Sequence, residues 1–236
     1  ALKRESEAMM ADLALQVKSA ATLQTAAGYA GSGSDAVRAD ISSAGGTEAL
    51  LAMLVQWPTD AKATEAALGG LWKLSRLAEV RAKLRSDGVR MVAEAFTRHM
   101  KNARVALACA AVLGNVCASA ELRSEVGAAG AGASALTAIS THLAKSLDVV
   151  MTCLFLLTNL CANHPANSDL VISAGGLPLI AALMSAYEQR PKVLARAATT
   201  VAAVVESGSS DSADDCCALA TDTMACTLRY LHLGKS

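Results

Sequence analysis

Seven cysteines and four histidines are the side chains of this 236-residue chain that could support metal or redox chemistry. Cys109 and Cys117 are eight residues apart (117 − 109), Cys153 and Cys161 are also eight apart (161 − 153), and the two pairs are offset by 44 residues (153 − 109). Metal sites use closely spaced ligands such as Cys-x-x-Cys, which the sequence lacks. The spacing therefore predicts a ladder of reduced cysteines packed as small apolar side chains, and no metal or cofactor is expected.

Three further cysteines, Cys216, Cys217 and Cys226, lie in the C-terminal segment. They are open to two interpretations, namely thiols that react or are modified, or reduced side chains of a closing helix. Reduced cysteines are typical of proteins inside the cell, so the composition favours an intracellular, cytoplasmic location.

The histidines, His99, His142, His164 and His232, have no serine, cysteine or carboxylate partner at a spacing that indicates catalysis. His99 and His142 fall near the ends of equivalent helices, which suggests surface positions. The sequence also contains no GxxxxGK, GxSxG or HExxH motif. We therefore expect a protein that is not an enzyme.

Charge and hydropathy narrow the range of partners. The chain has 21 Lys and Arg residues against 21 Asp and Glu residues, so no long-range positive field favours nucleic acid as a partner. The basic run RLAEVRAKLRSDGVR, residues 76–90, is either a site for an acidic partner or a solvated face.

The most apolar window, VVMTCLFLLTNLCA at residues 149–162, is shorter than the roughly 20 residues that a transmembrane helix needs. We expect a buried helix there and no transmembrane segment.

The chain repeats itself. Glycines of Ala-Gly-Gly-like elements recur at positions 46, 88, 132 and 176, at intervals of 42, 44 and 44 residues (88 − 46, 132 − 88, 176 − 132). This interval matches the roughly 40 to 47 residues of HEAT and armadillo units. At each joint a glycine is expected to end a short first helix in a left-handed conformation, and a second, amphipathic helix follows it.

A third and longer helix closes each period. The four third helices align as KATEAALGGLWKLSRLA, RVALACAAVLGNVCASA, VVMTCLFLLTNLCAN and VLARAATTVAAVVESG. Apolar residues occupy nearly their whole circumference, which indicates burial on several sides. Their starts carry caps or first-turn residues at Asp60 (or Thr59), Asn102, Ser146 and Pro191.

One stretch is specific enough to indicate a family. NHPANSDLVISAGGLPLIAALM, residues 163–184, resembles the first two helices of an armadillo repeat. The ends LGNVCA and LLTNLCA resemble the third helix of that family, with Asn115 and Asn159 at its characteristic asparagine position. HEAT repeats are the near competitor, but three helices per unit and the glycine joint favour armadillo. The resemblance implies an all-α fold, a right-handed α-solenoid (α-α superhelix) of armadillo-type three-helix repeats.

We expect a single repeat domain over residues 1–236. Its predicted parts are a partial opening repeat (1–34), four repeats (35–78, 79–120, 121–163 and 164–207), and a linker with a closing helix (208–236). The closing helix is predicted from about residue 216 to residue 233. A solenoid needs such covers because its end units otherwise leave an apolar face in water.

The resemblance also implies that the third helices line a concave groove that binds extended peptides or partner proteins. In armadillo importins and catenins, ladder asparagines bind the peptide backbone, and tryptophans one turn earlier flank its side chains. Here the asparagine ladder reads Arg76, Asn115, Asn159 and Glu206, and the positions four residues earlier read Trp72, Ala111, Phe155 and Ala202. Only part of the importin pattern is present, which puts binding of a nuclear localisation signal in doubt.

The candidate groove residues are Trp72, Arg76, Asn115, Phe155, Asn159 and Glu206. The asparagines either present amides to a ligand or bind a neighbouring loop, and Trp72 is either an anchor beside Arg76 or a core residue. The charges predict a partner that is acidic near Arg76 and basic near Glu206. We expect a non-catalytic scaffold or adaptor that binds a protein or extended peptide. The alternative is a permanent structural subunit of a large multiprotein assembly, held by its convex or end surfaces.

Overall fold

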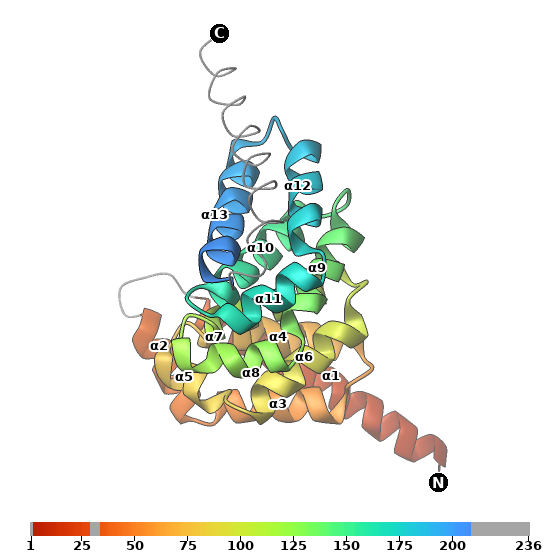
Figure 1. The fold of residues 1–236 in the computed structure, drawn as a ribbon. Helices are drawn as coiled ribbons and strands as arrows, with labels where there is room; N and C mark the ends of the chain where they lie inside the picture. Colours follow the sequence, from red (N-terminus) through yellow and green to blue (C-terminus); the bar gives the residue numbers. More distant parts are fainter. Residues whose placement is uncertain (1, 29–33, 209–236) are drawn as a thin grey trace.

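The computed structural model describes residues 2–28 and 34–208 (Figure 1). Within these residues the regular structure is helical. The elements are α1 (Leu2–Ala27), α2 (Ser34–Ser43), α3 (Gly46–Gln56), α4 (Ala61–Leu74), α5 (Ala78–Lys83), α6 (Asp87–His99), α7 (Ala103–Val116), the 3-10 helix η1 (Ala120–Leu122), α8 (Arg123–Ala128), α9 (Ala131–His142), α10 (Leu147–Cys161), α11 (Pro165–Ser173), α12 (Gly176–Ala186) and α13 (Pro191–Ser207). The predicted closing helix, residues 216–233, lies outside the described residues.

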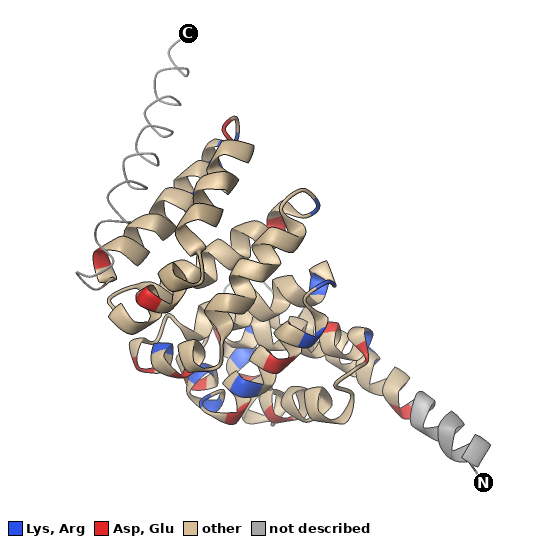
Figure 2. Cartoon of the chain, turned by 45° about the vertical axis from the view of Figure 1, so that its right-hand side comes forward, with Lys and Arg blue, Asp and Glu red and all other residues tan. Residues whose placement is uncertain are grey.

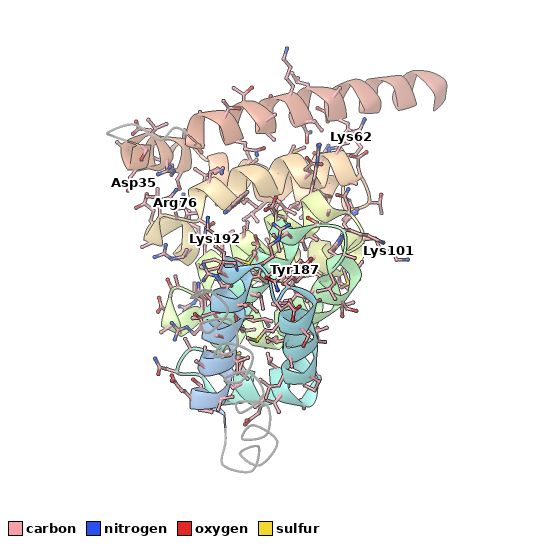
Figure 3. All side chains as sticks on the ribbon, turned by 90° about the horizontal axis from the view of Figure 1, so that it is seen from above. Asp35, Lys62, Arg76, Lys101, Tyr187 and Lys192 are labelled. Atoms are coloured by element: carbon pink, nitrogen blue, oxygen red, sulfur yellow. The ribbon has the colours of Figure 1, made fainter. Side chains whose placement is uncertain are left out.

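The helices form four consecutive groups of three, each made of a short first helix, a second helix and a longer third helix. The third helices α4, α7, α10 and α13 each pack on the third helix of the preceding group. Helix α1 packs on α4 in the same way and runs beside it, so it takes the place of a third helix before the first group (Figure 3). Nine of the 14 residues of α4 and ten of the 14 of α7 are buried. The predicted burial of these helices on several sides is confirmed.

The most apolar window of the sequence forms α10. This helix lies between α7 and α13, and its residues Leu154, Leu156 and Leu157 are fully buried. In the described part of the chain, no single helix has both the length and the apolar character needed to cross a membrane. The two helices α11 and α12 reach these criteria only together, and they are bent by 69° where they meet.

The joint between the first and second helices is one residue with a positive φ angle. In three units this residue is a glycine, with φ of 84° at Gly45, 77° at Gly130 and 75° at Gly175. Glycine adopts this conformation without steric cost. In the second unit the joint is Ser86, with φ of 61°, and the glycine expected to mark this joint, Gly88, lies inside α6. The Ser86 N–H donates to Oε2 of Glu125 in the next unit at 2.7 Å, which holds the joint in place.

The third helices begin at the residues that the sequence predicts. The carboxylate of Asp60 accepts the N–H of Ala63 at 2.8 Å, and Oδ1 of Asn102 caps α7 in the same manner. Pro191 is the first residue of α13. Ser146 is the N-cap residue of α10, as predicted, although its side chain makes no capping hydrogen bond.

Arginines at equivalent positions of the first helices bind the C-terminal carbonyl groups of the preceding third helices. The bonds join Arg38 Nε to Ala27 O (2.8 Å), Arg81 Nη1 to Ser75 O (3.3 Å) and to Arg76 O (2.8 Å), and Arg123 Nε to Cys117 O (2.9 Å). The last carbonyls of a helix have no partner within the helix and carry partial negative charge. A guanidinium group from the next unit satisfies them and fixes how consecutive units stack.

The fourth unit replaces the arginine with Asn167, which is buried. Its Nδ2 donates to Leu160 O at the end of α10 and to Arg123 O, each at 3.0 Å. Arg81 belongs to the basic run at residues 76–90, for which the sequence allows either a solvated face or a site for an acidic partner. Its contacts show that this part of the run is structural.

We expect Arg123→Ala to lower the free energy of unfolding by about 2 to 3 kcal/mol, because hydrogen bonds from a charged donor each contribute about 1.5 to 3 kcal/mol. The substitution removes the donors to Cys117 O and Ala162 O. Urea unfolding followed by circular dichroism measures the change. Arg90→Ala is the matched control, because Arg90 is exposed and its partners in the described part of the chain, Asp87 and Glu94, belong to its own helix. Its expected change is below about 0.5 kcal/mol, and equal losses in the two variants would contradict the capping role.

Candidate binding groove

The third helices are aligned here by the residue that precedes each one. These preceding residues are Asp60, Asn102, Ser146 and Arg190. The residues thirteen positions after them are Lys73, Asn115, Asn159 and Ala203 (73 − 60, 115 − 102, 159 − 146, 203 − 190). Arg76 and Glu206 are equivalent to each other but lie three residues beyond this position (76 − 73, 206 − 203). The predicted asparagine ladder is therefore out of register at both ends. In the first unit the sequence LSRLA resembles LGNVCA, which places Arg76 opposite Asn115. However, α4 ends at Leu74, so Arg76 lies in the turn that follows the helix.

The same alignment separates the two aromatic candidates. Phe155 is equivalent to Gly69, whereas Trp72 is equivalent to Gly114, three residues later. Phe155 lies on the side of α10 that faces α7, since a Cβ atom on Gly114 would come within 2.6 Å of its ring. The guanidinium carbon of Arg196, from α13, is 5.9 Å from the centre of the Phe155 ring. The ring thus joins three consecutive third helices, with a cation on the side of α13.

The two ladder asparagines connect neighbouring third helices. Asn115 Nδ2 donates to Ser75 Oγ at 3.0 Å and to Trp72 O at 3.3 Å. Asn159 Nδ2 donates to Gly114 O at 2.9 Å. Both side chains are half-buried. The donor side of each amide is therefore engaged by the preceding unit, and within the described residues no donor reaches Oδ1 of either asparagine.

Trp72 lines a hollow of about 270 Å³ on the face formed by the third helices. The hollow lies between α4 and α7, and α1 and α10 contribute to its rim. Its lining residues are Gln24, Glu65, Gly69, Trp72, Ala103, Arg104, Leu107, Ala108, Ser146 and Asp148. The Gln24 side chain of α1 lies over Gly69, since a Cβ atom there would meet Gln24 Oε1 at 2.4 Å. The indole is half-buried, so one face packs on the helices and part of the ring remains accessible.

Charged side chains of both signs surround this hollow. The ammonium group of Lys73 is 4.1 Å from the centre of the Trp72 ring. Arg104 Nη1 lies 3.3 Å from Glu65 Oε1 and so links α7 to α4. Asp148 is exposed at the start of α10. A polar rim around an accessible indole is a typical arrangement of a protein-binding anchor. The sequence reasoning missed Lys73, although counting from the Asp60 cap would have found it.

Arg76 and Glu206 are both exposed and lie at the far ends of the row of third helices. Arg76 and Lys62 stand at opposite ends of α4 (Figure 3). The carbonyl of Arg76 accepts a hydrogen bond from Arg81, while its guanidinium group points to no partner among the described residues. Glu206 is in the last turn of α13.

A second ladder, which the sequence reasoning did not identify, runs along the ends of the second helices. Each ring donates to the preceding unit. The pairs are Trp57 Nε1 with Gln16 Oε1 (3.1 Å), His99 Nε2 with Pro58 O (2.9 Å), His142 Nε2 with Met100 O (2.8 Å), and the Tyr187 hydroxyl with Leu143 O. His142 is only 3% exposed, so the expectation of a surface position is wrong for this residue. Its ring donates a hydrogen bond to Met100 O of the preceding unit.

One histidine does lie beside a hydroxyl group. His164 Nε2 is 2.8 Å from Ser124 Oγ, and its Nδ1 accepts the N–H of Asn167 at 3.3 Å as the N-cap of α11. A neutral imidazole whose Nδ1 accepts carries its proton on Nε2, so it donates to Ser124 and cannot remove the hydroxyl proton. The pair therefore lacks the polarity of a Ser–His nucleophile.

Four cysteines form the predicted ladder. Cys109, Cys117, Cys153 and Cys161 are all buried and free. Burial raises the pKa of Cys117 and Cys153 to about 12 and that of Cys161 to about 11. Burial, together with the nearby Cys153, also raises the pKa of Cys109. In the described ranges, no group of three or more His, Cys, Asp and Glu side chains is placed to hold a metal ion. Cys216, Cys217 and Cys226 lie outside these ranges.

No family model and no curated protein matches the chain. Solved structures do match it. An engineered protein from the Northeast Structural Genomics Consortium has a TM-score of 0.72 at 20% identity, over 92% of this chain and 90% of that chain. A designed armadillo repeat protein has a TM-score of 0.71 at 15% identity, over 93% of this chain and 98% of that chain. The fold is that of an armadillo repeat protein.

A further designed armadillo repeat protein, solved in complex with the peptide (KR)4, has a TM-score of 0.66 at 14% identity, over 91% of each chain. At such identities the likeness concerns the fold. The predicted all-α armadillo-type solenoid is confirmed. The hollow at Trp72 and the two asparagines lie on the third-helix face of an armadillo solenoid, and this face is the candidate groove.

The raised thiol pKa values predict that the armadillo core loses stability at alkaline pH. In the unfolded chain a cysteine ionises near 9, whereas Cys153 in the folded chain ionises near 12. Between these values the unfolded state binds fewer protons, so the unfolding free energy falls as pH rises, by up to about 1.4 kcal/mol per pH unit for each such thiol. Below pH 9 the full stability is present.

Urea unfolding under reducing conditions between pH 8 and pH 11 measures this slope. Lysine and tyrosine also titrate there, so the informative quantity is the difference between wild type and Cys153→Ala. We expect the variant to lose stability less steeply above pH 9. Identical slopes in the two proteins would show that Cys153 is not buried as described.

Proposed function

We propose that the chain is a non-catalytic scaffold or adaptor that binds a partner protein or an extended peptide in the groove. The proposed contact residues are Trp72, Arg76, Asn115, Phe155, Asn159 and Glu206, and we add Lys73 because its ammonium group lies over the Trp72 ring. The intracellular, cytoplasmic location expected from reduced cysteines is part of the same proposal. A designed protein of this fold was solved with a bound peptide, which supports the choice of ligand class.

The accessible indole of Trp72 is the observation that carries the proposal. It stands in a hollow of about 270 Å³ among aliphatic and charged side chains. Tryptophan is enriched at the residues that dominate the binding energy of protein interfaces, because its rigid ring buries a large area at low entropic cost. A packed core tryptophan would leave no such hollow beside its ring.

The asparagines support an extended ligand. Each Nδ2 is held by the preceding third helix, so the amide is fixed in orientation before a ligand binds. The remaining Oδ1 can accept a backbone N–H, a contact that tolerates any ligand sequence. Preorganisation of this kind lowers the entropic cost of binding. Asn115 and Asn159 would thus connect the units and also contact the ligand.

The charges at the ends of the groove suggest the polarity of the partner. Arg76 is exposed at the end of α4, and Glu206 is exposed at the end of α13. A partner with an acidic portion near Arg76 and a basic portion near Glu206 complements both, and such complementarity fixes the direction of binding more than its strength.

We expect the double variant Trp72→Ala with Asn115→Ala to lose at least one binding partner that wild type captures. Immobilised chains are incubated with the same cell extract, and the bound proteins are quantified by mass spectrometry. Arg90→Ala, which changes an exposed residue on α6 outside the groove, should capture the same proteins as wild type. Circular dichroism verifies that the double variant is folded, because Asn115 also bonds Ser75. If every captured protein is retained by the folded double variant, the groove is not the binding site.

A specific observation also favours the alternative, a permanent subunit of a larger assembly. Leu15 on α1 is 64% exposed and Val55 on α3 is 59% exposed. A hollow of about 370 Å³, lined on both helices by residues such as Leu15, Leu50 and Met53, lies between α1 and α3. In the later units a second helix occupies the equivalent position between a third helix and the next second helix. This end surface is thus shaped to receive a helix.

Gel filtration distinguishes the two functions. A permanent subunit without its assembly should associate or aggregate, and Leu15→Glu should restore a monomer. Leu170→Glu, at a residue that is 58% exposed on α11, is the control and should not. A wild-type chain that elutes as a soluble monomer supports the adaptor and contradicts the subunit.

A further inference from the structure

Ion pairs connect the first three units beside their helix joints. Lys83 Nζ in α5 lies 3.0 Å from Oε1 of Glu48 in α3. Arg85 Nε lies 3.1 Å from Oε1 of Glu125 in α8. Glu48 stands three residues after the positive-φ residue of its unit, and Arg85 stands directly before that of the second unit. These charged side chains link one joint to the first helix of the next unit.

The joint of the third unit carries neither charge. Counted from Gly130, the residue in place of Glu48 is Ala133 (48 − 45, 133 − 130), and the residue in place of Arg85 is Ala129 (86 − 85, 130 − 129). A hollow of about 410 Å³ lies between this joint and α11. It therefore opens where the earlier units have an ion pair. Its lining is mostly small or aliphatic and includes Gly127, Gly132, Ala133, Leu160 and Val171.

Asn167 is the buried polar side chain in this lining, and it is only 3% exposed. Its Nδ2 donates to Leu160 O and to Arg123 O, so both amide protons are used. A Cβ atom on Gly127 would come within 1.9 Å of Asn167 Oδ1, so this oxygen fits here only because residue 127 is glycine. Among the described residues no donor reaches Oδ1. A buried acceptor without a donor costs free energy, and a ligand with an N–H group would satisfy it.

Apolar surface continues from the hollow onto the outside of the molecule. Leu170 of α11 lines the hollow and is 58% exposed. Ala128, Ala133 and Ala174 also line it and are exposed. None of the described residues in this lining is charged, so an uncharged occupant is expected. A free small molecule would leave the apolar rim in water, whereas a protein surface would cover it, as is typical of exposed apolar patches at protein-binding sites.

We propose that this hollow binds the tryptophan side chain of a partner protein. The indole ring is apolar, and its N–H is a donor that matches the acceptor Asn167 Oδ1. Unlike a hydroxyl group, it brings no acceptor that needs a donor of its own. The volume lies in the range of roughly 300 to 1,000 Å³ that ligand sites occupy. The hollow is separate from the third-helix groove, so this assignment does not depend on the binding function proposed for the groove.

Titration with free indole tests the hydrogen bond. In ¹⁵N-labelled protein, the NMR signals of the Gly127, Gly130 and Gly132 amides report on the hollow, and we expect indole to shift them saturably. The comparison compound is 1-methylindole, which has no N–H, so Asn167 Oδ1 would stay without a donor. We expect it to bind roughly fivefold or more weakly than indole. The change is made in the ligand because Asn167 also joins two units. Equal affinities, or no shift with indole, would overturn the proposal.

A pair of variants tests the location. Ala133→Leu fills the hollow from α9 and should weaken indole binding by about tenfold or more, because the ring and the new side chain compete for one space. Thr137→Leu is the matched control, since Thr137 is exposed one turn further along α9 and outside the lining. It should bind indole as wild type does, and circular dichroism verifies that both variants are folded. If Ala133→Leu retains wild-type affinity, indole binds elsewhere and the hollow is not its site.

Peptides distinguish a protein partner from a free small molecule. The probes are two capped tripeptides in which tryptophan is flanked by leucines or by serines. We expect the leucine peptide to bind about tenfold more tightly, because its side chains cover the apolar rim. Leu170→Ser should remove most of this difference. If the two peptides bind equally while indole binds, the hollow takes a free small molecule and the assignment to a protein partner is wrong.

Discussion

Hydrogen bonding of the carbonyl groups at the ends of the third helices is the constraint on which this solenoid depends. Each third helix ends in carbonyls that have no donor within the helix, and the next unit must supply one. Arg38, Arg81 and Arg123 do so from equivalent positions, and Asn167 does so in the fourth unit. Because these donors come from the first helix of the following unit, they set the rotation and spacing between units. Hydrophobic contact between the third helices supplies most of the burial, but it is non-directional and would tolerate several registers.

The same requirement determines what the groove can offer a ligand. Asn115 and Asn159 donate to carbonyls and a hydroxyl of the preceding third helix, so they continue the inter-unit bonding on the groove side. An amide held in this way has one fixed orientation and a remaining acceptor. The asparagine side chains that join the units are therefore also oriented to accept a hydrogen bond from an extended ligand backbone. We expect a single substitution at either asparagine to weaken both the contact between units and ligand binding.

Much of this fold was predictable because it follows from periodicity. The joint glycines, the caps at Asp60 and Asn102 and the offset of the cysteine pairs all reflect short-range rules repeated every 42 to 45 residues. The errors concern contacts between units, which spacing does not encode. His142 is buried because its ring reaches Met100 O of the preceding unit, and Arg81 is structural because it binds the end of α4. Arg76 and Glu206 were placed on the asparagine ladder by similarity of helix ends, whereas the ladder is counted from the helix starts.

The distribution of charge along the solenoid indicates where specificity resides. Charged residues are denser over the first two units than over the later ones (Figure 2). The second helices α9 and α12 contain no Asp, Glu, Lys or Arg. A ligand in the groove would thus meet Lys73, Glu65 and Arg104 around Trp72 at one end. Toward α10 it would meet the Phe155 ring with the nearby Arg196 guanidinium, and the amide of Asn159. Charged contacts fix orientation and partner choice, while apolar and amide contacts add area with little selectivity. The discriminating contacts are therefore expected between α1 and α7, where the hollow at Trp72 lies.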